Sequence, residues 1–153
     1  MELDKIDKQI LQLLQNDSQI TVKDIAMRTG LSTTPVFARI KQLEKKGIIK
    51  KYVALVDRGK LDRGLTIFCI IVLNDGSKST YKKFETDIAK IEEVIECYKI
   101  AGNIDYLLKI VAKNIQEYND IINLKIVSLD TVRNTVTNFV MAEFKNTTVI
   151  PIK

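Results

Sequence analysis

The side chains best suited to contact another molecule lie in the stretch Gly30–Gly47, which reads GLSTTPVFARIKQLEKKG. On a helix, the side opposite the apolar positions would be small and polar near its start and basic near its end: Thr34, Ala38, Lys41, Gln42 and Lys45. Hydroxyl and amide groups hydrogen-bond base edges or phosphates, a small side chain fits against a thymine methyl group, and ammonium groups neutralise phosphates. The alternative is a surface helix with a solvated charge run.

The same stretch carries the start and stop signals of one helix. Ser32 supplies an N-cap hydroxyl, Pro35 falls in the first turn, and Gly47 closes the run. The positions at i, i+4 and i+7 form an apolar stripe to be buried: Val36, Ile40 and Leu43.

Two further helices are predicted before this one. Asp4 can cap a helix that ends near Asp17, and Thr21 with Asp24 resembles a capping box that opens a short helix of about eight residues. Gly30 then allows a positive φ, so that two short helices can cross steeply. The order of helix, short helix, glycine turn and longer helix predicts a helix-turn-helix.

After Gly47 the pattern becomes extended and rich in β-branched residues, in IIKKYVALV, before a turn signal at 57–59. We expect a short wing-like strand or a linker. Lys50 and Lys51 on it would contact the DNA backbone beside the groove, or else keep a solvated edge strand from aggregating.

The net charge of +5 supports contact with an anionic partner. Residues 1–60 contain 12 Lys and Arg against 7 Asp and Glu, whereas residues 61–153 contain 12 of each kind. The whole excess therefore lies in the first part, as phosphate neutralisation requires.

Composition narrows the class of protein. The chain has 153 residues, no histidine and two cysteines, Cys69 and Cys97, which we expect to be buried, reduced thiols. There is no run long enough to span a bilayer and no signal-peptide layout, so we expect a cytoplasmic protein without a membrane partner. No P-loop, dinucleotide fingerprint or nucleophile elbow is present, and we predict no enzyme activity, no metal site and no cofactor.

The second part of the chain alternates between strand and helix patterns. Strands are predicted over 65–73, 94–101, 105–112 and 132–144, and helices over 78–93 and 114–127. The order βαββαβ predicts a ferredoxin-like domain, with four antiparallel strands and both helices on one face of the sheet, so that the whole chain is of the α+β class.

The opposite face of that sheet would be left without a helix. Apolar side chains are nevertheless expected on it: Phe68, Ile70, Val72, Leu107, Phe139 and Met141. We therefore predict a homodimer that pairs two such sheets.

The loop Gly102–Tyr106 is the one place in the second part that suggests a ligand. Asn103 and Asp105 offer an amide and a carboxylate able to hold the two charged groups of a zwitterion. Glycine and asparagine are also ordinary turn formers, so a plain hairpin turn remains the alternative.

These residues carry a family resemblance. The segments LDKIDKQILQLLQND and DIAMRTGLSTTPVFARIKQLEKKGIIKKYVALVD resemble the DNA-binding domain of the Lrp/AsnC, or feast/famine, transcription regulators. With the βαββαβ part, the similarity covers nearly the whole chain. It implies domains at 1–50 (helix-turn-helix), 51–64 (wing or linker) and 65–153 (effector binding and oligomerisation), with dimers that often assemble into octamers.

The helix-turn-helix pattern and the resemblance together assign roles on double-stranded DNA. At the start of the helix, contacts with bases or phosphates are assigned to Ser32, Thr33 and Thr34. Ala38 is assigned a contact with a thymine methyl group, and Lys41 and Gln42 are assigned contacts with further bases. Phosphates are assigned to Arg39, Lys45, Lys50 and Lys51. Arg39 has an alternative role in fixing the domain internally, because it lies at the edge of the buried stripe.

The resemblance also assigns an effector site. In the family, a glycine-x-x-aspartate loop lines an amino-acid pocket between dimers, and Gly102 and Asp105 match it, whereas Asn103-Ile104 departs from the common form. Thr135 and Thr137 stand where the family often adds polar contacts, although β-propensity alone also explains threonines there.

The sequence thus predicts a sequence-specific DNA-binding transcription regulator modulated by an amino acid or a related metabolite. Two alternatives stay open. One is a nucleoid-type architectural protein with little sequence preference, and the other is a metabolite-sensing interaction module.

Overall fold

The computed structural model describes residues 3–152, which form two compact units. The first runs to Leu55 and takes in the segment from Lys145 onwards, and the second is Val56–Phe144. The predicted division at 65–153 therefore differs at its C-terminal end, because the last residues pack with the first unit. Among the described residues, no helix is both long and apolar enough to cross a membrane.

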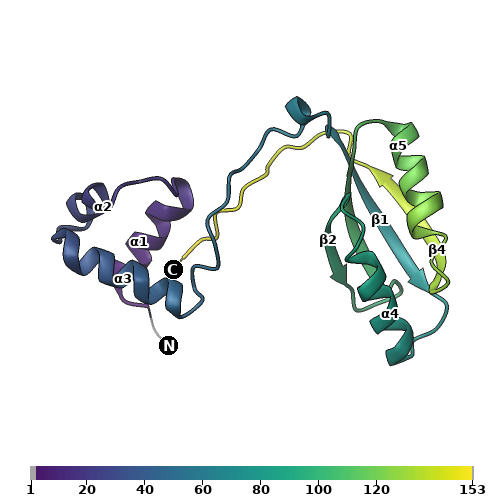
Figure 1. Ribbon diagram of the computed structural model, residues 1–153, viewed down its shortest axis with the longest axis horizontal. Coiled ribbons are helices and arrows are strands. Elements are labelled where there is room, and N and C mark those ends of the chain that lie inside the picture. Colours follow the sequence, from purple (N-terminus) through teal and green to yellow (C-terminus); the bar gives the residue numbers. More distant parts are fainter. Residues whose placement is uncertain (1–2, 153) are drawn as a thin grey trace. The chain divides into compact units, whose positions relative to one another are not determined.

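The first unit contains three helices, α1 (Lys5–Asn16), α2 (Val22–Thr29) and α3 (Thr33–Lys45) (Figure 1). The caps predicted at Asp4 and Thr21 are present, since Asp4 Oδ1 accepts from the Asp7 N–H at 2.8 Å and Thr21 Oγ1 accepts from the Asp24 N–H at 3.1 Å. Gly30 ends α2 with φ of +71°. The predicted helix-turn-helix is confirmed.

The core of this unit forms where the three helices meet. Ile10 of α1, Ile25 of α2 and Val36 of α3 are each fully buried. The predicted stripe on α3 is confirmed, because Ile40 and Leu43 are buried beside Val36. Burial of one apolar face per helix fixes which face of α3 is left to solvent.

Two local predictions differ from the structure. Ser32 takes the N-cap position of α3, but its side chain makes no capping hydrogen bond. The segment 46–64, all of it described, contains the short 3₁₀ helix η1 (Gly59–Leu61) and no strand. Because this described segment contains no strand, the linker alternative is the one that fits the structure.

The C-terminal segment completes the first unit. The Ile150 N–H donates to Gln15 Oε1 at 2.7 Å, and Gln15 Nε2 donates to the Ile150 carbonyl at 3.2 Å. Ile152, partly buried, packs against the core of the three helices. The side-chain amide of α1 thus pairs with an extended backbone much as a neighbouring strand would.

The second unit is the predicted βαββαβ domain. Its elements are β1 (Leu65–Leu73), α4 (Lys78–Ile88), β2 (Val94–Lys99), β3 (Tyr106–Ala112), α5 (Ile115–Asp120), the π-helical segment η2 (Ile121–Ile126) that continues α5, and β4 (Val132–Phe139). The four strands are antiparallel in the order β2-β3-β1-β4. This is the ferredoxin-like arrangement, and the predicted α+β fold is confirmed.

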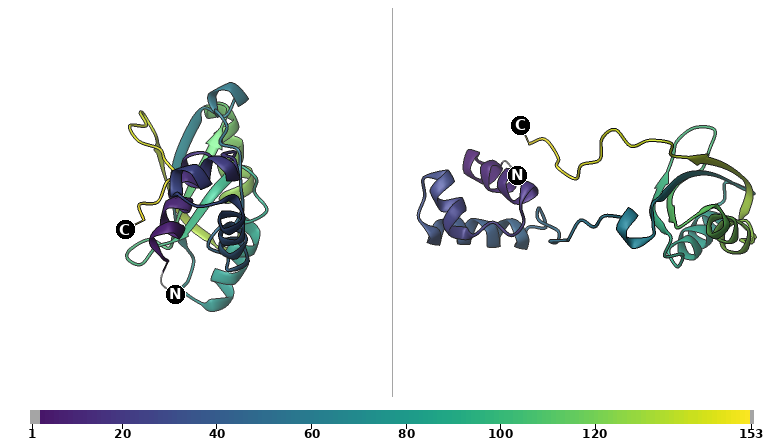
Figure 2. Two further views of the ribbon diagram at one scale, coloured as in Figure 1. Left: turned by 90° about the vertical axis from the view of Figure 1, so that its left-hand side faces the viewer. Right: turned by 90° about the horizontal axis from the view of Figure 1, so that it is seen from above.

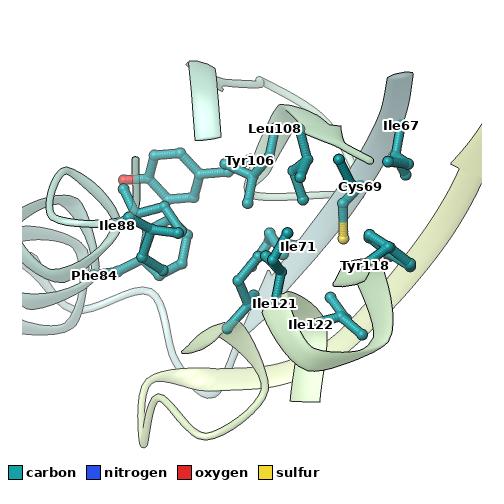
Figure 3. Packing of buried hydrophobic residues seen from close by; sticks show 14 of the residues in the cluster. Ile67, Cys69, Ile71, Phe84, Ile88, Tyr106, Leu108, Tyr118, Ile121 and Ile122 are labelled. Carbon is teal, nitrogen blue, oxygen red and sulfur yellow. The ribbon is translucent and has the colours of Figure 1, made fainter. Parts of the chain in front are cut away.

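The helices α4 and α5 cover one face of this sheet (Figure 2). Alternate residues of β1 (Ile67, Cys69 and Ile71) point to that face and are fully buried. Phe84 from α4 and Tyr118 from α5 pack against them (Figure 3). Burial raises the pKa of the Cys69 thiol to about 11.

The other face of the sheet carries no helix of its own domain, and part of the predicted apolar set lies on it. Ile70 pairs with Val136 across β1 and β4, and Val136 is 47% exposed. Phe139 was wrongly placed on this face: it pairs with the buried Ile67, and its ring contacts Tyr118 at 5.4 Å between centroids. Met141 lies beyond the end of β4.

Two further differences concern the end of a helix and the burial of a cysteine. The helix predicted to reach residue 93 ends at Ile88, although Ile91 is still buried, because a tight turn follows in which the Ile91 N–H donates to the Ile88 carbonyl. Cys97 is exposed rather than buried, because it lies on the edge strand β2.

Candidate nucleic-acid interface and ligand loop

The outer face of α3 is open to solvent. The exposed residues include most of those assigned to DNA: Ser32, Thr33, Thr34, Ala38, Lys41, Gln42 and Lys45. Their exposure follows from the burial of Val36, Ile40 and Leu43 on the other side of the helix. At the N-terminus of α3, Ser32, Thr33 and Thr34 are exposed, and the first-turn N–H groups of a helix have no partner within the helix.

Arg39 does not share that exposure. Its Nη1 donates to Asp4 Oδ2 at 2.5 Å and to Asp7 Oδ1 at 2.7 Å. The hydrogen bonds to Asp7 and Asp4 raise the pKa of Arg39, and those from the Asp7 N–H and from Arg39 lower the pKa of Asp4. This favours the alternative in which Arg39 fixes α3 to the start of α1.

Lys41 is exposed, but it is bonded to a neighbouring carboxylate. Its Nζ donates to Glu44 Oε2 at 2.7 Å, and the Tyr52 hydroxyl donates to Glu44 Oε1 at 3.0 Å. These two bonds lower the pKa of Glu44. Since an ammonium group has three N–H donors, Lys41 retains donors for a base or a phosphate beside this carboxylate.

One exposed side chain on this face was missed by the sequence reasoning. Phe37 is 53% exposed, although it stands beside Val36, which is fully buried. Its spacing from Thr34 and Lys41, three and four residues away, was the available signal that it belongs to the outer face.

Lys50 and Lys51 are both exposed and follow α3 on the extended segment. Their exposure suits contacts with phosphates.

The second predicted site is the loop between β2 and β3. Gly102 has φ of +145°, a region that favours glycine, and the Ile100 N–H donates to the Asp105 carbonyl at 2.9 Å to close the turn. Gly102 and Asn103 are exposed. The loop is therefore a tight turn whose tip is accessible.

Asp105 is committed to contacts within its own domain. Its Oδ2 accepts from the Leu73 N–H at 2.8 Å, and its Oδ1 accepts from the Tyr81 hydroxyl at 3.1 Å. The bond to Asp105 raises the pKa of Tyr81. Lys99 Nζ lies 3.3 Å from the centroid of the Tyr81 ring, so a cationic group already covers this side of the loop.

Thr135 and Thr137 are not brought to this loop. They pair with Ile71 and Cys69 on the face of the sheet that the helices cover. Thr137 shares a hydrogen bond with the Tyr118 hydroxyl. Since β1 lies between β3 and β4, the threonines are about two strand spacings, or roughly 10 Å, from the end of β3.

An open cavity of about 270 Å³ lies elsewhere in this domain. It is lined by Asn74, Asp75, Ser79, Thr80, Lys83, Asp130 and Thr131. Lys83 is paired with Asp130 there, so the cavity combines acidic and basic groups.

Comparison with known proteins identifies both units. Residues 3–50 match the family model described as winged helix-turn-helix DNA-binding, and residues 66–150 match the model described as Lrp/AsnC ligand binding domain. The chain belongs to the Lrp/AsnC family. It is therefore a DNA-binding transcription regulator with a small-molecule ligand-binding domain, and not an enzyme.

Whole relatives in the Lrp/AsnC family support the assignment. The chain is 37% identical to the leucine-responsive regulatory protein of Escherichia coli (strain K12), over 99% of this chain and 93% of the relative. A transcriptional regulator of Neisseria meningitidis, solved as a complex with L-Met, has a TM-score of 0.94 at 31% identity, over 98% of this chain and 97% of that one. An AsnC family transcriptional regulator of Agrobacterium tumefaciens has a TM-score of 0.92 at 36% identity, over 97% of each chain.

Proposed function

We propose that this regulator reads duplex DNA by placing α3 in the major groove. The observation that carries the proposal is the exposed, polar outer face of α3 in a matched helix-turn-helix. In this reading, base edges or first-turn phosphates are contacted by Ser32, Thr33 and Thr34, and further bases by Ala38, Lys41 and Gln42.

Phosphate contacts are assigned to Lys45, Lys50 and Lys51, which are exposed on α3 and just after it. Arg39 is assigned a positioning role instead, because Asp4 and Asp7 occupy its guanidinium. The charge excess of the first 60 residues supports a binding mode in which several phosphates are neutralised.

Selection of sites from a random duplex pool, followed by affinity measurement at fixed salt, tests this function. The selected site should bind at least about a thousandfold more tightly than random duplex. Equal affinity for both would favour the architectural alternative. Absence of any salt-dependent DNA binding would favour the interaction-module alternative.

A homodimer would present two copies of α3 related by a two-fold axis. The helix-free face of the sheet, with Ile70 beside the exposed Val136, supports a second copy as the partner, and assembly of dimers into octamers follows from the family resemblance. Two copies of α3 would then meet half-sites about 34 to 36 Å apart, or a multiple of that distance. Sedimentation of the full chain should give at least the mass of a dimer, and a lone monomer at micromolar concentration would refute the pairing.

The ligand is proposed to be an amino acid. Support comes from the match to a Lrp/AsnC ligand binding domain and from the L-Met complex of the Neisseria meningitidis relative. Gly102 and Asn103 are exposed and can offer backbone and amide groups to a ligand. Both carboxylate oxygens of Asp105 already accept a hydrogen bond, from Leu73 and from Tyr81, so Asp105 would bind a ligand only through its remaining lone pairs.

Calorimetry against the twenty amino acids tests the ligand and its place. Heat of binding that is lost in Asn103→Ala, a change of one exposed side chain, would support the loop. Binding that survives this change but is lost in Lys83→Ala would move the site to the 270 Å³ cavity. No binding by any of the twenty would refute an amino-acid effector while leaving DNA recognition intact.

A further inference from the structure

Phe37 is an aromatic residue in an unusual place. It lies in the second turn of α3 and is 53% exposed, while Val36 and Ile40 beside it are 0% and 7% exposed. Single exposed apolar side chains are common on protein surfaces. What sets Phe37 apart is the face on which it stands.

That face is the one assigned to the DNA groove. Phe37 is three residues after Thr34 and four before Lys41, so the three side chains stand in one row along the helix. The next residue, Ala38, is exposed and small, and it allows the helix backbone to come close to a partner. The ring thus shares the outer face of the helix with exposed polar and small residues.

The ring also has a cation beside it. Lys41 Nζ lies 5.6 Å from its centroid, and Lys41 forms a 2.7 Å ion pair with Glu44. Tyr52 donates to the same carboxylate at 3.0 Å. A phenyl ring has only two rotatable side-chain bonds, so ordering it on binding costs little conformational entropy.

The major groove displays one apolar group among its base edges, the C5-methyl group of thymine. We propose that the Phe37 ring packs against a thymine methyl group in each half-site and so selects thymine at that position. The inference rests on the proposed reading role of α3 and names a specificity-determining residue within it. The exposed part of the ring is available for this contact, since Phe37 is 53% exposed on the outer face of α3.

Replacement of thymine by deoxyuridine tests the proposal, because it removes only the methyl group and keeps the base pair. A duplex selected with the full chain is remade with each thymine exchanged in turn, and affinities are compared at one salt concentration. The wild type should lose about fourfold in affinity at one thymine per half-site, as expected for exposing one buried methyl group.

Variants at the ring separate this contact from the rest of the interface. Phe37→Ala should abolish the difference between thymine and deoxyuridine at that position, and Phe37→Leu should keep part of it. Lys45→Ala should weaken binding but leave the difference unchanged. Because Phe37 is exposed, its variants should melt with the wild type by circular dichroism.

The outcomes are distinct. If Phe37→Ala and the wild type discriminate equally at every thymine, the proposal is overturned while α3 remains the reading helix. If the random pool yields no enriched sequence, the proposed function fails and this inference fails with it.

Discussion

Replacement of Asp105 by alanine would remove two internal hydrogen bonds from the second domain. The carboxylate accepts from the Leu73 N–H at 2.8 Å and from the Tyr81 hydroxyl at 3.1 Å. Leu73 ends β1 and is 3% exposed, so its amide would lose its acceptor where water has little access. A hydrogen bond to a charged group contributes about 1.5 to 3 kcal/mol, and we expect the change to cost about 2 kcal/mol.

A cost of this size is measurable in a domain as small as Val56–Phe144. At about 4 to 8 °C per kcal/mol, the midpoint of thermal unfolding should fall by roughly 10 °C. The assay is circular dichroism of the full chain without added amino acid, following the transition of this domain.

Two matched variants test whether the carboxylate itself stabilises the domain. Asp105→Asn keeps one acceptor and should lower the midpoint less, and Tyr81→Phe, which removes only a hydroxyl donor, should also have a smaller effect than alanine. If Asp105→Ala unfolds within about 2 °C of the wild type, the carboxylate does not support the fold. In that case, loss of ligand binding in Asp105→Ala could be attributed to a lost contact with the ligand. The bonds of Asp105 to Leu73 and Tyr81 do not allow that attribution now.

Three further predictions concern the first unit. Arg39→Ala should lower its unfolding midpoint by roughly 5 °C in a thermal melt, because the tie between α3 and α1 is lost; an unchanged midpoint would show that the ion pairs contribute nothing. Since the folded-state pKa of Asp4 is lowered, its stabilisation is present above the unfolded pKa and is lost as pH falls through the folded value; Asp4→Asn should therefore flatten the acid limb of stability against pH, and an identical limb would contradict this. Ile152→Ala together with Gln15→Ala should free the C-terminal segment, seen as faster amide exchange at Ile150, whereas unchanged exchange would mean that the contacts do not hold it.

Local signals account for most of the correctly predicted fold. Capping at Asp4 and Thr21, together with the apolar spacing on α3, placed three helices within a residue or two, because caps and amphipathic faces depend on neighbours along the chain. The continuous apolar run of β1 was bounded correctly at Leu65–Leu73, since Asn74 and Gly76 after it interrupt a strand.

Contacts between distant residues could not be predicted in this way. The pairing of Arg39 with Asp4, of Asp105 with Leu73, and of Gln15 with Ile150 joins positions that no periodicity relates. Two of them change the interpretation of a candidate residue, because Arg39 is bonded to α1 and its N-cap and Asp105 is bonded within its own domain. Of these pairings, the sequence indicated only an internal role for Arg39, as an alternative, and it named no partner for that residue.

The faces of β4 show a different limit. Strand alternation puts Phe139 on the same side as Thr137, and the pairing of Thr137 with the buried Cys69 shows that this side faces the helices. Without the register to β1, alternation alone does not say which of the two faces is covered.

The central claim is that the outer face of α3 reads bases while the lysines after it hold phosphates. The most direct measurement compares selected and random duplexes, at one salt concentration, for Lys41→Ala with Gln42→Ala and for Lys50→Ala with Lys51→Ala. The first pair should lower the ratio of the two affinities, and the second should weaken both duplexes alike and reduce the salt slope by about one per lysine. Equal losses from both pairs on every sequence would contradict the account.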